Sequence, residues 1–151
     1  MSKESILVTQ SGADTYTAGS ISTGLTADGK AGWQINAIEA FWSDGAAVAA
    51  ADWSVNAACQ TVATQTTYGD DDEITRVSWG VQNTGGVAVA NPYDPVKTAI
   101  LIEPRVTVQP SLFFGVTSSN TAQANDVIFV VYYEIVKLSD IEVLRLLAGG
   151  A

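Results

Sequence analysis

The sequence has 151 residues, of which 47% are hydrophobic and only 15% are charged, where about 25% charged residues is usual for a globular chain. The net charge is −9 and the basic residues are scattered, so direct binding to nucleic acid or to an anionic membrane surface is not expected. There is no His and a single cysteine, Cys59, which excludes an internal disulfide and every nucleophile activated by His.

The N-terminal segment MSKESILVTQ lacks the apolar core of a signal peptide. No apolar run reaches the roughly 20 residues that a membrane helix needs. We therefore expect synthesis in a cytoplasm without membrane insertion. The length suits one domain, residues 1–151. No phosphate-binding loop lies between a strand and a helix, and no cofactor is indicated.

Short bursts of strand-forming residues predict strands in the first half of the chain at residues 5–10, 14–23, 32–42 and 54–62. Within the third strand, the apolar residues of Trp33–Ile35 share one face, whereas those of Ile38–Trp42 share the other. This change of phase predicts a bulge or bend near Ala37. The Ala-rich residues 46–51 favour a helix by propensity, and their structure is left open.

The second half predicts strands at residues 73–82, 87–90, 96–102, 105–108, 112–116 and 125–138. Breaks are expected at Pro104 and Pro110, because proline lacks a backbone donor and restricts the residue before it. The last strand, Asn125–Leu138, is apolar at nearly every position. Such a pattern predicts burial on both faces.

Ser139 and Glu142 form a capping box, which predicts a helix that ends at Gly149-Gly150. Its apolar residues span roughly 220° at about 100° per residue, although a helix packed on one core needs a stripe only about 100° wide. Val143, Leu146 and Leu147 form one group, and Ile141, Leu144 and Ala148 form the other. We expect one group to pack on its own domain and the other on a neighbouring subunit. The alternative is a helix wedged entirely into its own fold. The candidate subunit contacts are Ile141, Val143, Leu144, Leu146 and Leu147.

About eight short strands, turns rich in Gly, Pro and Asn, and one terminal helix predict an all-β fold. We expect a single antiparallel jelly-roll sandwich or barrel with a short C-terminal helix. An immunoglobulin-like sandwich is the alternative, and the absence of a Cys pair weakens it.

The stretch TTYGDDDEITRV, residues 66–77, contains the tetrapeptide that carries metal-binding aspartates in RNA-dependent RNA polymerases. The polar residues before it and the short chain argue against that interpretation. Asp70–Glu73 could supply half of the six to eight oxygens that Ca²⁺ takes, but adjacent side chains on an extended chain point to opposite sides. The pattern favours an acidic turn that leads into a strand, with no metal site.

The four tryptophans, Trp33, Trp42, Trp53 and Trp79, could form a platform for a sugar, although burial is the usual fate of a tryptophan within a strand. Cys59 lies in an alternating segment that predicts a buried small hydrophobe. No catalytic residues are identified, and we expect that the protein is not an enzyme.

Three segments, DEITRVSWGVQNTGG, DPVKTAILIEPRVTVQPSLFFGVTSSNT and NDVIFVVYYEIVKLSDIEVLRLL, resemble in order and character the second half of a single jelly-roll capsid protein. The family is that of small tailless icosahedral viruses of bacteria and archaea, and the resemblance covers about half the chain. It implies a homo-oligomeric shell subunit of a virion, without catalytic residues and with other virion proteins as possible partners. MSKESILV is not the basic arm found in many shell proteins that wrap RNA. The alternative function is a carbohydrate- or calcium-binding β-sandwich module.

Overall fold

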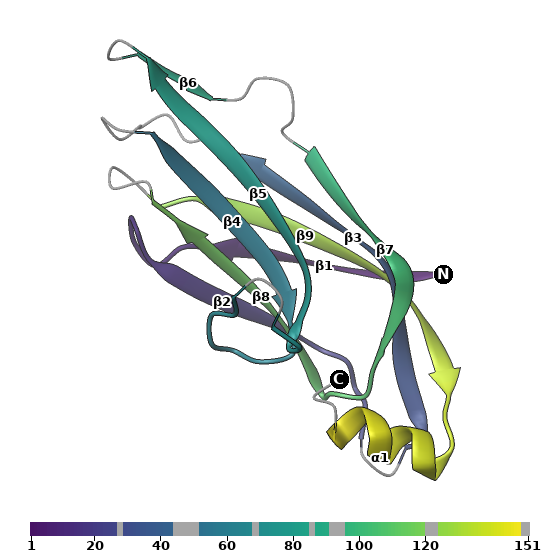
Figure 1. The fold of residues 1–151 in the computed structure, drawn as a ribbon. Helices are drawn as coiled ribbons and strands as arrows, with labels where there is room; N and C mark the ends of the chain where they lie inside the picture. Colours follow the sequence, from purple (N-terminus) through teal and green to yellow (C-terminus); the bar gives the residue numbers. More distant parts are fainter. Residues whose placement is uncertain are drawn as a thin grey trace.

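The computed structural model describes residues 1–26, 29–43, 52–67, 70–84, 87–90, 96–119 and 124–148. These residues form two β-sheets packed face to face, with one helix at an end of the sandwich (Figure 1). The elements are β1 (Ser2–Thr9), β2 (Tyr16–Ser22), β3 (Ala31–Ser43), β4 (Trp53–Gln60), β5 (Glu73–Thr84), β6 (Val87–Ala90), β7 (Val96–Thr107), β8 (Ser111–Ser118), β9 (Asp126–Lys137) and α1 (Asp140–Ala148).

The strand order identifies the fold. One sheet has the order β1-β9-β3-β7 and the other β2-β8-β4-β5-β6. The antiparallel pairs are nested in the sequence: β4 with β5, β3 with β7, β2 with β8, and β1 with β9. Successive pairs alternate between the two sheets, which is the arrangement of a jelly roll. The prediction of an all-β jelly roll with a short C-terminal helix is therefore confirmed, and the immunoglobulin-like alternative is wrong.

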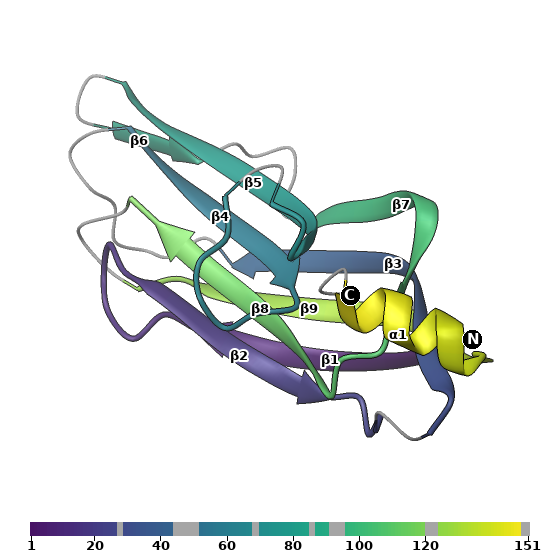
Figure 2. The same cartoon turned by 60° about the horizontal axis from the view of Figure 1, so that its bottom comes forward.

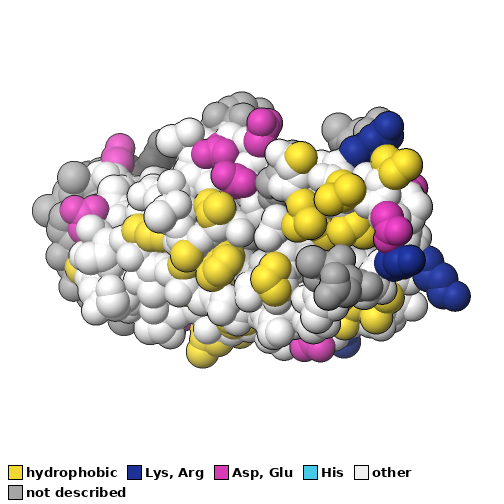
Figure 3. Space-filling model, turned by 90° about the horizontal axis from the view of Figure 1, so that it is seen from below, with side chains coloured by type: hydrophobic (Ala, Val, Ile, Leu, Met, Phe, Trp, Pro, Cys, Tyr) yellow, Lys and Arg dark blue, Asp and Glu magenta, His cyan; other side chains and the backbone are white. Residues whose placement is uncertain are grey.

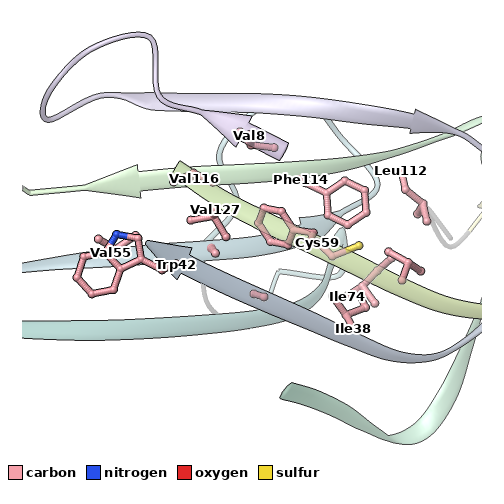
Figure 4. Packing of buried hydrophobic residues seen from close by; sticks show 14 of the residues in the cluster. Val8, Ile38, Trp42, Val55, Cys59, Ile74, Leu112, Phe114, Val116 and Val127 are labelled. Atoms are coloured by element: carbon pink, nitrogen blue, oxygen red, sulfur yellow. The ribbon is translucent and has the colours of Figure 1, made fainter. Parts of the chain in front are cut away.

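The hydrophobic core fills the space between the two sheets. Phe114 and Phe129 lie 5.0 Å apart between ring centroids, one from each sheet. Each fully buried side chain of this size stabilises the fold by about 1.5–3 kcal/mol. Figure 4 shows several of these side chains pointing into the interior from strands of both sheets, among them Val8, Ile38, Val55, Leu112 and Phe114.

The change of phase in β3 is a β-bulge. The register of β3 against both of its neighbours shifts between Ile35 and Ala37. The extra residue returns the second half of the strand to the core side, so that Ile35 and Ile38 are both fully buried. The predicted bulge is confirmed.

The predicted break at Pro104 is wrong, because β7 runs through it from Val96 to Thr107. The pairing with β3 jumps there: Ile35 lies opposite Arg105, and Ala37 lies opposite Ile100. Pro104 falls inside that jump, on the edge strand of its sheet, where a missing donor is tolerated. Pro110 does separate two strands, as expected. Residues 46–51 lie outside the described residues.

The prediction that β9 is buried on both faces is also wrong. Val127, Phe129 and Val131 point into the core, but Ile128, on the other face of the strand, is exposed. The other face of β9 is the outer surface of the four-stranded sheet, over which the described part of the chain lays no further layer (Figure 1). An apolar pattern on both faces of this strand therefore does not reflect burial within one chain.

A buried polar cluster closes the end of the sandwich where β9 begins. Gln10 Oε1 accepts hydrogen bonds from Ser118 Oγ at 3.0 Å and from the Asn125 backbone N–H at 2.9 Å. Asn125 Oδ1 in turn accepts the indole N–H of Trp42 at 3.2 Å. These bonds tie the ends of strands from both sheets together, and α1 occupies the opposite end, where β9 ends (Figure 2).

Candidate functional site

The position of α1 is set by contacts at its first turn. The Ser139 backbone N–H donates to Glu142 Oε2 at 2.7 Å, and the Glu142 N–H donates to Ser139 Oγ at 3.3 Å. These two bonds are the predicted capping box, and they hold the pKa of Glu142 below its ordinary value. The Leu138 N–H donates to the Lys30 carbonyl at 2.8 Å, which fixes the corner before the helix.

Gly32 lets that corner close. A Cβ at this position would lie 2.9 Å from Leu138 Cδ1 and 2.9 Å from Val106 Cγ1. A larger residue at this position would have to displace both side chains, so Gly32 allows β3 to lie close to this corner. The orientation of α1 therefore follows from the cap, the Leu138 bond and this close approach.

No helix among the described residues is long and apolar enough to cross a membrane.

The two apolar groups of α1 have different surroundings. Val143 is buried and Leu146 is half-buried against the chain's own fold. Ile141 and Leu144 are each 65% exposed, and Leu147 is 39% exposed at the boundary between the groups. Seen from this end, hydrophobic side chains gather on the surface between acidic and basic ones (Figure 3). We call the exposed residues Ile141, Leu144 and Leu147 the helix face.

At about 100° per residue, Arg145 lies next to Ile141 at the border of the helix face, whereas Glu142 lies about 160° around the helix from Leu144. Asp140 begins the helix and lies 3.5 Å from Lys30 Nζ, in an exposed pair that contributes little stability. The helix is thus acidic in its first turn and basic in its last turn. Both charges suit the helix macrodipole.

A second apolar surface crosses the outer face of the four-stranded sheet. Leu7 of β1 lies opposite Ile128 of β9, which in turn lies opposite Phe41 of β3. Residues opposite one another on antiparallel strands share a face, so these three side chains form a row. Leu7 is 59% exposed, Ile128 is 45% exposed and Phe41 is half-buried. We call Leu7, Ile128 and Phe41 the sheet row. The sequence pattern of β9 contained this surface, but it was interpreted as core.

The acidic stretch Asp70–Glu73 is a turn that leads into β5, as predicted. Asp70 Oδ1 accepts the Asp72 backbone N–H at 3.0 Å, and Asp72 Oδ1 accepts Thr61 Oγ1 at 3.0 Å. Glu73 pairs with Arg76, with 2.6 Å between Oε2 and Nη2. Three of the four carboxylates thus bind donors of the protein in different directions. Within the described residues, no group of three or more His, Cys, Asp or Glu side chains is placed to hold a metal ion.

A polar network beneath this turn was not foreseen. Gln60, fully buried, donates from Nε2 to Tyr16 Oη at 2.6 Å and to the Thr64 carbonyl at 2.7 Å. Thr66 Oγ1 lies 2.9 Å from Gln60 Oε1 and 2.8 Å from Glu73 Oε2. Burial raises the pKa of Tyr16. The network holds the segment after β4 against the outer face of the five-stranded sheet. A polar residue such as Gln60 in an alternating strand is expected to face solvent, so the sequence pattern does not predict this network.

The tryptophans are part of the core. Trp42 contacts Trp53 and Trp79 across the two sheets, with ring centroids 5.5 Å and 5.9 Å apart. Trp33 stacks on Tyr133 at 3.6 Å. All four tryptophans are buried, so they do not present a platform to a sugar. Cys59 is buried as predicted, and burial raises the pKa of its thiol.

No protein-family model matches the sequence, and the search of curated proteins gives no match. Among solved structures, a chain described as Desmodium yellow mottle tymovirus is similar. It is 12% identical, with a TM-score of 0.32, and the match covers 91% of this chain and 89% of that one. At this identity and TM-score the likeness does not bear on function, and the fold assignment rests on the strand order.

Proposed function

We propose that the protein is a structural shell subunit, a capsid protein that assembles with further copies of itself in a virion. The helix face carries this proposal. Its three large aliphatic side chains stand in solvent on a helix whose opposite side is buried against its own fold. Soluble monomers rarely expose contiguous apolar surface of this kind without a partner.

The composition and the fold support the same proposal. A chain with few charges and a second apolar surface, the sheet row, is suited to contact with neighbours on more than one side. The proposed role is structural and involves no catalysis. The partners are further copies of the chain and other proteins of the particle, with no direct contact to nucleic acid because of the net charge of −9. The binding-module alternative has lost its support, since the tryptophans are buried and the carboxylates bind protein donors.

The test compares the wild-type chain with Leu144→Asp and a matched control, Ser20→Asp. Leu144 and Ser20 are both exposed, so neither aspartate disturbs the core. Light scattering after size exclusion and negative-stain microscopy should show assemblies for the wild type and the control. An aspartate buried at an apolar contact is costly, so Leu144→Asp should raise the concentration needed for assembly by at least about tenfold. Melting temperatures should agree within a few degrees.

A wild-type chain that stays monomeric at high concentration over several salt conditions overturns the proposal. Normal assembly of Leu144→Asp would show that the helix face is not a contact between copies, and this result would also overturn the proposal. The substitution is sharper than deletion of residues 139–151, because the deletion also removes Val143, which is buried in the chain's own fold.

A further inference from the structure

Helix α1 buries little of its own surface against the sandwich. Val143 is its one buried residue and Leu146 is half-buried, whereas the rest of the helix is exposed. The pair between Lys30 and Asp140 at its start is exposed as well and contributes little stability. By contrast, β8 buries five of its eight residues. The attachment of α1 to the sandwich therefore depends mainly on one side chain.

The corner that leads into α1 is held by a backbone hydrogen bond made at a strained residue. The Leu138 N–H donates to the Lys30 carbonyl at 2.8 Å. Lys30 has a φ of 49°, in the left-handed region that an L side chain adopts at a cost. This cost offsets part of what the bond contributes. The two bonds of the capping box join residues of the first turn of the helix to each other, so they stabilise the helix without attaching it to the sandwich.

We propose that α1 opens and closes as one unit on the folded sandwich, about the chain between Leu138 and Ser139. Burial of one Val side chain and part of a Leu side chain, opposed by the entropy of ordering the segment, favours the closed state by about ten- to a hundredfold. Unfolding of a whole domain is disfavoured on the order of a thousandfold or more. A helix of nine residues is not stable alone in water, so α1 loses its structure when it opens.

The two states present different apolar surfaces to a neighbouring molecule. The closed state exposes the helix face, and opening adds Val143 and Leu146 to the exposed side chains. This conformational change goes beyond the proposed function and does not depend on it, because it takes place within a single chain.

The experiment measures labelling of thiols by iodoacetamide in the full chain, in dilute solution, with mass spectrometry as the readout. Val143→Cys places a thiol at the buried contact, and Leu144→Cys places one at the exposed neighbouring position. The native Cys59, which is buried between the sheets in both variants, reports the opening of the whole domain. Val143→Cys should react about ten- to a hundredfold more slowly than Leu144→Cys and at least about tenfold faster than Cys59.

Low concentrations of urea should separate the two kinds of opening. The Val143→Cys rate should stay nearly constant, whereas the Cys59 rate should rise steeply, because sensitivity to denaturant scales with the surface exposed on opening. If Val143→Cys reacts as slowly as Cys59 and with the same dependence on urea, α1 opens only when the domain unfolds and the proposal is wrong.

Hydrogen exchange of the wild type checks the result without a substitution. Amides in the second half of α1 should be protected, but at least about tenfold less than those of the buried part of β9. Equal protection of the two elements would overturn the proposal. Unprotected α1 amides, together with Val143→Cys labelling as fast as Leu144→Cys, would show that the closed state does not form and would overturn it as well.

Discussion

Glu73 and Asp70 stand in one acidic turn, yet their surroundings differ. The Glu73 side chain is only 7% exposed and binds Arg76 and Thr66, whereas Asp70 is exposed and caps a backbone N–H. Glu73→Gln should therefore destabilise the fold by about 1.5–3 kcal/mol, the range for hydrogen bonds to charged groups. Asp70→Asn keeps an acceptor and should change stability by no more than about 0.5 kcal/mol. Urea unfolding of both variants measures the difference.

Equal effects of the two substitutions would contradict the network described here. A row of four acidic residues predicts a solvated turn, and for Asp70 and Asp71, which are exposed, that prediction holds. It does not hold for Glu73, because its partners come from a neighbouring strand position and from a segment folded back over the sheet. Arg105 adds to this from the other sheet, with Nη2 2.6 Å from the Asp71 carbonyl. Such contacts depend on the tertiary fold and leave no trace in local pattern.

At the scale of the elements, sequence patterns predict correctly those features that depend on local residues alone. The bulge in β3 followed from a two-residue period that changes phase, and the helix start followed from Ser139 and Glu142. The outcome at Pro104 depended on something the local sequence does not contain, namely that β7 is an edge strand. The outer face of β9 is predicted wrongly because periodicity reports which positions are apolar and does not report which of them another layer of the fold covers.

The start of α1 should respond to acid through Glu142. Its pKa is lowered by the bonds to Ser139, so its contribution to the helix is complete above the ordinary carboxyl pKa of about 4.3 and is lost as pH falls through the lowered value. Hydrogen-exchange protection of α1 amides should fall in that range in the wild type. The nearby charges are Arg145 in the last turn and the exposed Lys30–Asp140 pair.

Glu142→Gln provides the control for this acid response. The variant carries no titrating group at the cap, so α1 protection should change little over the same pH range. A wild-type response that persists unchanged in Glu142→Gln would show that the acid sensitivity does not come from Glu142.

At the scale of the whole molecule, the two apolar surfaces have different consequences for assembly. A closed shell needs more than one kind of contact per chain. Besides the helix face, the sheet row of Leu7, Ile128 and Phe41 is a second exposed apolar surface on the described chain. The proposed shell therefore uses the helix face and the sheet row as two separate contacts between copies.

Variants at the two surfaces should stop assembly at different stages. A chain with Leu7→Asp and Ile128→Asp keeps its core, because both side chains are on the outer face of the sheet. It should accumulate small oligomers that are still joined through the helix face. Adding Leu144→Asp to the same chain should give monomers. Light scattering distinguishes these species, and large particles formed by the Leu7→Asp/Ile128→Asp chain would show that the sheet row is not a contact.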